Sequence, residues 1–469
     1  MTNETEGFDF LILGGGSAGY AAARTAHNLG KRVAVVDGAA ELSGLCILRG
    51  CMPSKTLIYS AEVLHLAQQG DVFGFKGGNP VADMQAMQQR KREVIREFSE
   101  YRKEQLEDGR FSLFKDYGHF RDLNSVELSD GKILRAEKIL ISTGSIIKTP
   151  DLPGLRGCSF KTSDDVLDLN YLPEECIVLG GGVVACELAQ FLARVGCRVV
   201  QLQRSSHVLK EFAQASSETV AEALRDNGIN LMTNVSLESF EDRPGERVRV
   251  NFEHEGESRT LETKFLFNAL GRQPATASLG VDKVGLVLRS SGHLAANEYQ
   301  QTNVPHIYAA GDCTGPHEIV HVAIRQGETV AKHAFGQSVN PMTYDSLLTV
   351  VFTDPQIARV GLSQEQMTKR GCLYTSASFP FDDHGKSILM EAKRGYVAVH
   401  ADKNTGRILG AECASKDAGE LIHSMSVAVG LGATVHNMLK ADWYHPTLSE
   451  IWTYPLEDLA EEITPSKPD

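Results

Sequence analysis

The order of apolar and polar positions in this chain predicts two copies of one strand–turn–helix–strand unit. Short apolar runs indicate the strands, glycine-rich runs indicate the turns, and the stretch after each turn indicates a helix. In the first copy the four elements are expected at 9–13, 14–19, 20–29 and 31–37. In the second copy they are expected at 177–179, 180–185, 186–195 and 198–203. The repeat predicts two parallel α/β domains of the Rossmann type.

Further segments outside the two repeats also have recognisable patterns. Each unit later returns a strand that ends in glycine, at 139–144 and at 265–271, and residues 150–154 indicate a linker between the units. A charged stretch, 81–107, predicts an amphipathic helix that starts at an Asp83 cap and serves packing. The residues expected on its apolar face are Met84, Met87, Val94 and Phe98.

Both turns have the glycine spacing of a dinucleotide-binding fingerprint. Glycines at these positions let the backbone approach a pyrophosphate at the N-terminus of the following helix. An acid at the end of the second strand is expected to bind a ribose 2′-hydroxyl. The candidate contacts in the first unit are Gly14, Gly16, Ser17, Gly19 and Asp37.

The second unit differs at the position of the acid. Asp37 follows Gly14 by 23 positions, and Gln203 follows Gly180 by the same 23. Gln203 and the adjacent Arg204 can accept a 2′-phosphate that an acid would repel, and Lys210 lies close behind. The second site, with Gly180 and Gly182 in its turn, therefore favours NADP. The alternative is that Arg204 and Lys210 are solvated surface charges.

Composition and charge exclude several classes of protein. The chain has 469 residues, enough for about two to four domains, with 42% hydrophobic and 23% charged residues. Its net charge of −13 disfavours a general nucleic-acid binder. No apolar run reaches the ~18 residues of a membrane span, and residues 8–13 are better explained by a strand than by a signal peptide. A cytoplasmic location is expected.

Cys46 and Cys51 are the most informative of the nine cysteines. A regular helix would separate their Cα atoms by ~7.5 Å along its axis, whereas a disulfide needs about 4.4–6.8 Å. A tightened turn entering a helix is therefore expected, with Pro53 poorly suited to a helix interior. Such a disulfide beside a nucleotide cofactor is expected to be redox-active. The other seven cysteines lack CxxC or CxxH spacing, so no metal site is inferred.

Together these motifs resemble the FAD-dependent pyridine nucleotide-disulfide oxidoreductases. Besides the two fingerprints and the cysteine pair, the segment 307–312 resembles the second FAD motif of that family, and 321–323 resembles its segment beside the flavin. Residues 350–355 resemble the start of its dimerisation domain, and 444–450 resemble its C-terminal His-Pro-Thr…Glu motif. The resemblance covers nearly the whole chain.

The resemblance implies an α/β fold with two Rossmann-like domains, for FAD and NAD(P), and a C-terminal α+β dimerisation domain. The expected boundaries are 1–150 for the FAD domain with the redox disulfide, 151–280 for the NAD(P) domain, 281–345 for a return to the FAD and central region, and 346–469 for dimerisation. It also implies further cofactor contacts, at Thr143, Gly144, Gly271, Gly311, Asp312, His321 and Ala323.

The resemblance also assigns roles in catalysis. Cys51 is expected to exchange electrons with FAD, and Cys46 to exchange with the substrate sulfur. His445 from the partner subunit, oriented by Glu450, is the expected base, so the active unit is expected to be a homodimer. Lys55 and Glu187 are expected to pair beside the flavin.

The chain departs from the family at four positions. Leu45 and Leu48 replace a threonine and an asparagine that flank the first cysteine in most members. Val183 stands where a larger residue often gates the nicotinamide pocket. Trp443 replaces a histidine and is expected at the mouth of the substrate channel.

The resemblance leaves several substrates open. Ser17 and Arg24 resemble positions that glutathione reductases use, but Glu328 stands where those enzymes carry an arginine and is expected to repel glutathione. Mercuric reductases end in a cysteine pair, which is not seen here. The first expectation is a dihydrolipoamide dehydrogenase-like enzyme acting on lipoyl groups, free or on a lipoylated carrier protein. The alternatives are an NADPH-dependent reductase of another low-molecular-weight disulfide, or a transhydrogenase or oxidase.

Overall fold

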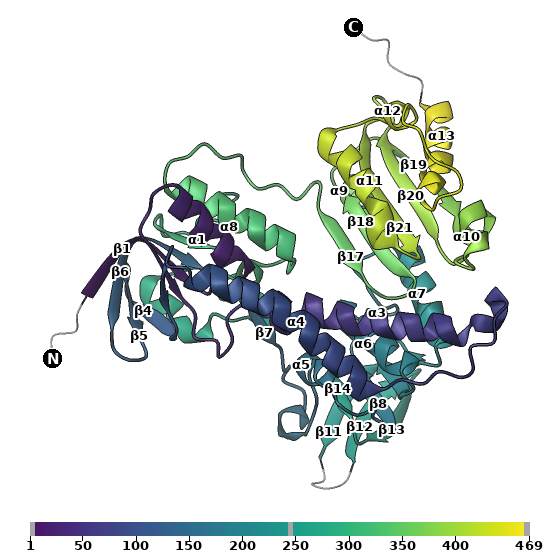
Figure 1. Ribbon diagram of the computed structural model, residues 1–469, viewed down its shortest axis with the longest axis horizontal. Coiled ribbons are helices and arrows are strands. Elements are labelled where there is room, and N and C mark those ends of the chain that lie inside the picture. Colours follow the sequence, from purple (N-terminus) through teal and green to yellow (C-terminus); the bar gives the residue numbers. More distant parts are fainter. Residues whose placement is uncertain (1–4, 243–246, 464–469) are drawn as a thin grey trace.

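The computed structural model describes residues 5–242 and 247–463 (Figure 1). The first sheet has the strand order β3-β2-β1-β6-β5-β4, with β16 also paired to β6. Its strands are β1 Thr5–Leu13, β2 Val33–Val36, β3 Ser112–Phe114, β4 Gly118–Asp122, β5 Ser125–Leu128, β6 Ile133–Ile141 and β16 Ile307–Ala309. β1, β2, β3, β6 and β16 are parallel, so their carboxyl ends lie at one edge of the sheet.

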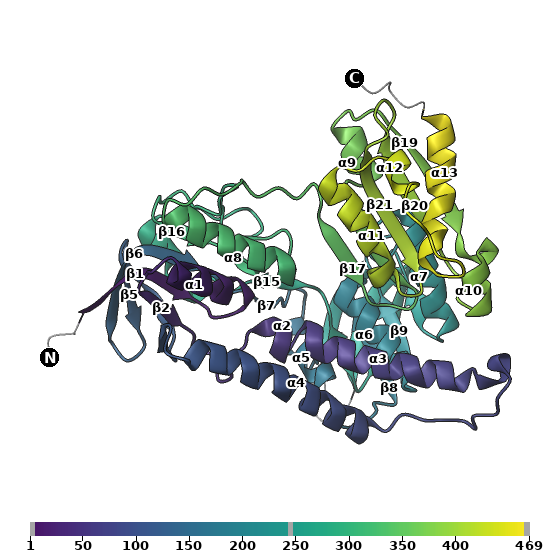
Figure 2. The same cartoon turned by 45° about the horizontal axis from the view of Figure 1, so that its top comes forward.

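Two helices cover one face of this sheet. α1 Ser17–Asn28 and α8 Val320–Ala334 lie side by side in both ribbon views (Figure 2). They approach so closely that a Cβ on Gly327 would lie 2.1 Å from the carbonyl oxygen of Ala18. Phe10 and Ile12 of β1 pack in the cluster with these helices, and Leu11 and Leu13 pack in the cluster on the other face.

The second unit repeats the arrangement with the strand order β10-β9-β8-β14. Its elements are β8 Glu175–Leu179, α6 Val183–Arg194, β9 Arg198–Leu202, α7 Gln214–Asp226, β10 Asn230–Met232 and β14 Leu266–Asn268. A separate sheet contains β11 Ser236–Glu241, β12 Val248–His254 and β13 Glu257–Thr263. β7 Ser145–Ile147 and β15 Arg272–Pro274 pair antiparallel between the two units.

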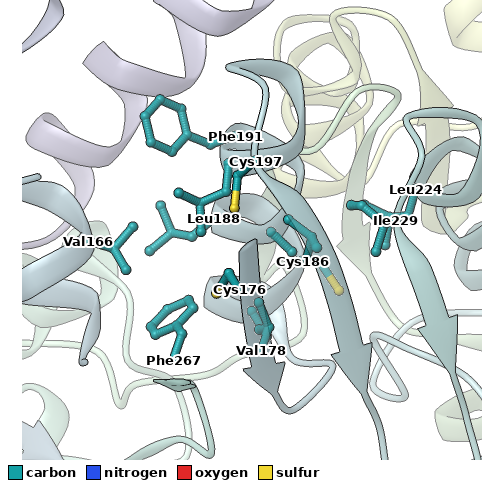
Figure 3. Packing of buried hydrophobic residues seen from close by; sticks show 14 of the residues in the cluster. Val166, Cys176, Val178, Cys186, Leu188, Phe191, Cys197, Leu224, Ile229 and Phe267 are labelled. Atoms are coloured by element: carbon teal, nitrogen blue, oxygen red, sulfur yellow. The ribbon is translucent and has the colours of Figure 1, made fainter. Parts of the chain in front are cut away.

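Figure 3 shows the buried core of the second unit, and this core also takes in side chains from neighbouring regions. Three of the nine cysteines, Cys176, Cys186 and Cys197, are buried in it among aliphatic and aromatic side chains, and burial raises the pKa of each thiol. Leu57 from α3 Cys51–Gln68 and Val351 from β17 Leu348–Val351 pack into the same cluster. These thiols therefore serve packing, and the core joins the second unit to α3, the helix that begins at Cys51.

The long charged helix, α4 Met84–Glu107, begins directly after the expected cap, Asp83. Asp83 caps it as expected, since its carboxylate accepts the N–H of Ala86 at 3.0 Å. The expected apolar face was wrong at Phe98, which is exposed. The buried side includes Gln88 and Lys91 instead, because both donate hydrogen bonds to the carbonyl oxygen of Leu167.

The C-terminal region is an antiparallel sheet with the strand order β17-β18-β21-β20-β19. Its further strands are β18 Gln356–Gly361, β19 Tyr374–Pro380, β20 Tyr396–Asp402 and β21 Ile408–Ser415. Its helices are α9 Gln364–Lys369, α10 Gly385–Leu389, α11 Ala418–Leu431, α12 Val435–Met438 and α13 Thr453–Glu462. The fold is thus the expected one, with two dinucleotide-type units followed by an α+β region.

Candidate active site at the junction of two dinucleotide folds

The first glycine turn lies at the carboxyl edge of the first sheet. A Cβ on Gly14, whose φ is +101°, would lie 2.4 Å from the carbonyl oxygen of Ser142, and one on Gly19 would lie 1.9 Å from that of Gly14. Gly16 is the N-cap of α1, and no side chain caps this end. The first N–H groups of α1, including that of Ser17, are therefore available to an anionic ligand.

The neighbouring strand ends meet this turn. Asp37 follows β2, and its Oδ2 accepts the N–H of Gly15 at 2.8 Å. Thr143 and Gly144 follow β6, and the buried hydroxyl of Thr143 has no hydrogen-bond partner within residues 5–242 and 247–463. Asp312 follows β16 and accepts the hydroxyl of Ser145 at 2.8 Å. An unpartnered buried hydroxyl beside a capless helix fits a bound dinucleotide such as FAD.

Three more expected cofactor contacts border the same cradle. Gly311 has a φ of +79° and donates its N–H to Gln326 on α8 at 2.7 Å. His321 and Ala323 lie in the first turn of α8, where His321 is exposed and Ala323 is buried. The tertiary structure therefore brings the two glycine segments, Asp37, Thr143, Asp312 and Ala323 to one end of the first unit.

The second glycine turn repeats the geometry. A Cβ on Gly180, whose φ is +112°, would lie 2.7 Å from the carbonyl oxygen of Ala269, and Gly182 is an uncapped N-cap of α6 with open space around it. Gly271, with a φ of +106°, follows β14. This cradle fits a second dinucleotide.

Gln203 takes the place that Asp37 has in the first unit. Asp37 lies against Gly15, and the Gln203 side chain lies against Gly181. Its Nε2 donates to the carbonyl oxygen of His207 at 3.2 Å, which ties the side chain to the loop that follows β9. Arg204 and Lys210 are exposed on this loop, where they can meet a ligand or solvent.

The thiols lie where a short helix is interrupted and a longer one begins, whereas a single tightened turn entering a helix was expected. α2 Leu45–Leu48 stops before Arg49 and Gly50, and α3 begins at Cys51. Pro53 is in the first turn of α3, where its missing N–H costs nothing. Gly44 touches the FAD cradle, because a Cβ there would lie 2.8 Å from Cα of Gly16. Both cysteines are free thiols in this structure, with Cys46 half-buried and Cys51 exposed.

The two thiols differ in acidity. The thiol of Cys46 donates a hydrogen bond to Cys51, and this bond, with the charge of Lys55, lowers the pKa of Cys51 to about 7. The same hydrogen bond and burial raise the pKa of Cys46. Cys51 is therefore the thiolate of the pair near neutral pH, and Cys46 holds the shared proton.

Lys55 and Glu187 pair, as expected from the sequence. Lys55 Nζ on α3 lies 2.8 Å from Glu187 Oε2 on α6, and their side chains are 31% and 3% exposed. Glu187 Oε1 also accepts the N–H of Phe352 at 2.8 Å, and Nζ lies 4.6 Å from the centre of the Phe352 ring. One buried carboxylate thus joins α3, α6 and the start of the C-terminal region.

The same face of α6 binds the segment after Phe352. Gln190 accepts the N–H of Asp354 at 2.7 Å and donates to its carbonyl oxygen at 2.8 Å. Arg194 pairs with the Asp354 carboxylate at 2.7 Å. The sequence analysis missed these contacts, although Gln190 and Arg194 follow Glu187 by three and seven residues, spacings that place all three on one helix face. These contacts hold α6 against the C-terminal region.

His445 and Glu450 form the expected pair. His445 Nδ1 lies 3.0 Å from both carboxylate oxygens of Glu450, and the side chains are 76% and 12% exposed. Within the described part of the chain, no hydrogen bond or ion pair joins His445 to either active thiol. An exposed base without a thiol in its own chain fits a site completed by a second subunit.

A second imidazole, which sequence reasoning missed, approaches the same carboxylate. His384 is fully buried, and its Nε2 lies 3.5 Å from Glu450 Oε1. The only sequence signal is a histidine in a short polar run, Asp382-Asp383-His384, some 60 positions from its partner. Its pairing is a product of the tertiary fold.

The departures from the family occupy varied surroundings. Trp443 is partly buried against the C-terminal core, and its Nε1 donates to the carbonyl oxygen of Met438 at 3.2 Å. The exposed aromatic beside it is Tyr444. Val183 starts α6 and is partly buried against the core of the second unit. Leu45 and Leu48 are half-buried in α2.

The charges near α1 are already paired. Arg24 and Glu328 form an ion pair of 2.9 Å between α1 and α8. Glu328 therefore neutralises the arginine that resembles a glutathione contact, in addition to being an acid at that position. Within the described ranges, no group of three or more His, Cys, Asp or Glu side chains is placed to bind a metal, and none of the helices is long and apolar enough to cross a membrane.

Comparison with known proteins agrees with this architecture. Residues 8–327 match the pyridine nucleotide-disulphide oxidoreductase family, and residues 347–455 match the dimerisation domain of the same family. The family is FAD-dependent and uses NAD(P)H, and the dimerisation domain indicates a homodimer. FAD, a nicotinamide dinucleotide and a redox disulfide are thereby supported, whereas the preference for NADP stays a prediction.

Similar proteins have several activities. The dihydrolipoyl dehydrogenase of Chlamydia pneumoniae is 32% identical over 96% of this chain and 96% of its own length. A mercuric reductase of Bacillus cereus is 31% identical over 94% of this chain and 70% of its own length. The structure of the HOCl-induced flavoprotein disulfide reductase RclA from Escherichia coli superposes with a TM-score of 0.85 and 26% identity, covering 96% of this chain and 99% of that one. The chain is a member of the pyridine nucleotide-disulphide oxidoreductase family.

Proposed function

We propose that this enzyme exchanges electrons between a small dithiol–disulfide substrate and NAD(P) through Cys46 and Cys51, with lipoyl groups as the first candidate substrate. The observation that carries the proposal is the place of the two thiols. Gly44 packs them against the first glycine turn, and Lys55 ties their helix to the second dinucleotide unit through Glu187. Bound FAD supplies the two-electron chemistry between thiols and nicotinamide.

The thiol chemistry uses the unequal acidities of the pair. When a dithiol is oxidised, a substrate thiolate attacks Sγ of Cys46 in the Cys46–Cys51 disulfide, and Cys51 leaves as a thiolate. The second substrate thiol then attacks the mixed disulfide, releases the oxidised substrate and returns Cys46 as a thiol. The substrate loses two electrons and two protons: the electrons reduce the Cys46–Cys51 disulfide, one proton ends on Cys46 and the other on the base, His445. A low pKa at Cys51 favours its departure.

His445 is the proposed base for both proton removals. Its Nδ1 faces Glu450, so its Nε2 is the nitrogen that can accept a proton from a thiol. We assign this base to the partner subunit, because His445 is exposed and its dimerisation domain meets a second copy. Lipoyl groups, free or on a carrier protein, suit a site whose nearby arginine, Arg24, is already neutralised by Glu328.

The favoured nicotinamide is NADP, because Gln203 replaces the ribose-binding acid and Arg204 and Lys210 are exposed beside it. That preference also supports the second candidate, an NADPH-dependent reductase of another low-molecular-weight disulfide. A transhydrogenase or oxidase in which the thiols are bystanders is the third. Full turnover by Cys46→Ser would favour the third candidate over the first two.

The deciding experiment is steady-state turnover of the purified holoenzyme. Dihydrolipoamide is supplied with NAD⁺ or NADP⁺, and lipoamide and a panel of other disulfides are supplied with NADH or NADPH. Turnover of dihydrolipoamide supports the first candidate, and the ratio of kcat/KM for the two nucleotides tests the preference. Turnover only of another disulfide with NADPH supports the second candidate.

A further inference from the structure

We propose that His384 is a positioning residue for the His445–Glu450 pair, and that it sets how strong a base His445 is. The inference rests on the role of His445 in the proposed function and adds a third member to the pair. It concerns a side chain that makes no contact with the thiols of its own chain.

The geometry places two imidazoles on one carboxylate. Glu450 is 12% exposed, with both oxygens 3.0 Å from His445 Nδ1. His384 is 0% exposed, and its Nε2 lies 3.5 Å from Glu450 Oε1. Among residues 5–242 and 247–463, this buried Nε2 makes no hydrogen bond, and the Glu450 carboxylate lies within ion-pair distance of it. A buried donor without another acceptor gains most from that carboxylate.

Ser387 selects the tautomer of His384. His384 Nδ1 lies 2.7 Å from the buried hydroxyl of Ser387, at the start of α10. When that hydroxyl donates to Nδ1, the proton of a neutral ring is on Nε2 and points at Glu450. Burial lowers the pKa of His384, against the opposing effect of Glu450, so the ring is neutral near pH 7.

Few other charges face this group. Tyr454 on α13 packs edge-on at 6.3 Å between ring centres, and Phe381 at 6.2 Å is apolar. On its own segment, Asp382 and Asp383 are exposed and Lys386 is half-buried. Glu450 and His445 are therefore the titratable groups that couple to His384 through space.

The physical consequence is a shared carboxylate. The N–H of His384 partly offsets the negative charge of the Glu450 carboxylate and restricts the rotamers of its side chain. Without that donor, the undivided negative charge of Glu450 acts on His445 and stabilises its protonated form more strongly. The carboxylate also holds the His445 ring less firmly, so fewer rings are oriented toward a substrate thiol.

The test compares pH profiles of the holoenzyme. In His384→Leu, we expect kcat/KM for dithiol oxidation to fall about tenfold and its acidic limb to move up by about half a pH unit or more. His384→Asn restores a donor and should recover part of both effects. Ser387→Ala removes the hydroxyl that is hydrogen-bonded to His384 Nδ1, so the ring can adopt either tautomer. This variant should move the acidic limb of the pH profile in the same direction as His384→Leu, but by less. Dye reduction by NADPH, which bypasses the thiols, confirms that each holoenzyme is intact.

His400→Leu is the matched control. His400 is also buried in the C-terminal region and its Nδ1 lies 2.8 Å from a serine hydroxyl, that of Ser376, but it does not contact Glu450. Its loss should leave the acidic limb in place. If His384→Leu and His384→Asn also leave the limb in place while His445→Gln loses dithiol turnover, the inference is wrong and the proposed function stands. If His445→Gln keeps full turnover, the proposed function itself fails.

Discussion

Lys55 and Glu187 stand 132 positions apart in the chain, yet their charged atoms lie 2.8 Å apart. Lys55 lies on α3, which starts at the active thiol Cys51. Glu187 lies near the start of α6, in the second dinucleotide unit. The carboxylate is buried and also holds the backbone of Phe352. One pair therefore connects the thiols, the nicotinamide unit and the dimerisation region.

Removing Lys55 should destabilise the protein. In Lys55→Met the buried carboxylate of Glu187 keeps only the Phe352 N–H, so we expect the free energy of unfolding to fall by about 2 kcal/mol. This is less than the 3–5 kcal/mol of a fully buried pair because Lys55 is partly solvated. Urea unfolding of the holoenzyme measures it. Lys76→Met, at an exposed lysine, should change stability by less than about 0.5 kcal/mol, and an equal loss would contradict the prediction.

The acidity of Cys51 should depend on Cys46. In the wild-type dithiol form the pKa of Cys51 is lowered to about 7, first by the Cys46 thiol and then by Lys55. Cys46→Ala removes the donor, so the pKa rises toward the usual value of about 8.5. When the pH is lowered, the Cys51 thiolate and the long-wavelength absorption band that it forms with FAD should then be lost at a higher pH than in the wild type. Absorbance against pH measures this, and Cys46→Ser, which keeps a hydroxyl donor, is the control.

Equal midpoints in Cys46→Ala and Cys46→Ser would show that the hydrogen bond does not set the acidity of Cys51. A band that never forms in either variant, with FAD bound, would remove Cys51 from its assigned place beside the flavin.

Two inactive variants should complement each other if the site is shared between subunits. His445→Gln should lower dithiol turnover about 10²-fold, the usual scale for loss of a general base. Cys46→Ser should lower it at least as far. After random reassortment of the two variants, half of the dimers are mixed and each mixed dimer has one intact site, so about a quarter of wild-type turnover should return.

Mixing after unfolding and refolding with FAD measures this recovery. Mixing each variant with itself is the control. No recovery, with mixed dimers detected by a tag on one variant, would place His445 and Cys46 of one chain in the same site.

The nicotinamide preference should reside in Arg204. If it binds a 2′-phosphate, Arg204→Ala loses a charge-assisted contact of about 1.5–3 kcal/mol, which raises KM for NADP(H) about 10- to 100-fold and leaves KM for NAD(H) unchanged. Arg259→Ala, at a surface arginine of β13 in the same unit, is the control. Equal KM changes for both nucleotides would indicate that Arg204 is a solvated surface charge.

Local features explain why much of the fold was predictable. The glycines at 14, 19 and 180 occupy positions where a Cβ would strike backbone, and Asp83 caps its helix with its own side chain. Such constraints act within a few residues, so they require particular residue types at particular positions and can be recognised in the sequence. The polar buried side of α4 left none, because Lys91 and Gln88 are buried only through a carbonyl of a distant segment, that of Leu167.

The sequence by itself therefore determined the two dinucleotide cradles and the turn that enters a helix at Cys46 and Cys51, because both depend on short-range spacing of glycine and thiol groups. The His445–Glu450 pair was identified through the resemblance of its segment to the family motif. Only the tertiary structure decided that Trp443 packs inward and that His384 joins Glu450. His384 and Glu450 lie 66 positions apart, and Trp443 packs on a core built from many segments of the C-terminal region, so only the tertiary fold brings these side chains to their partners.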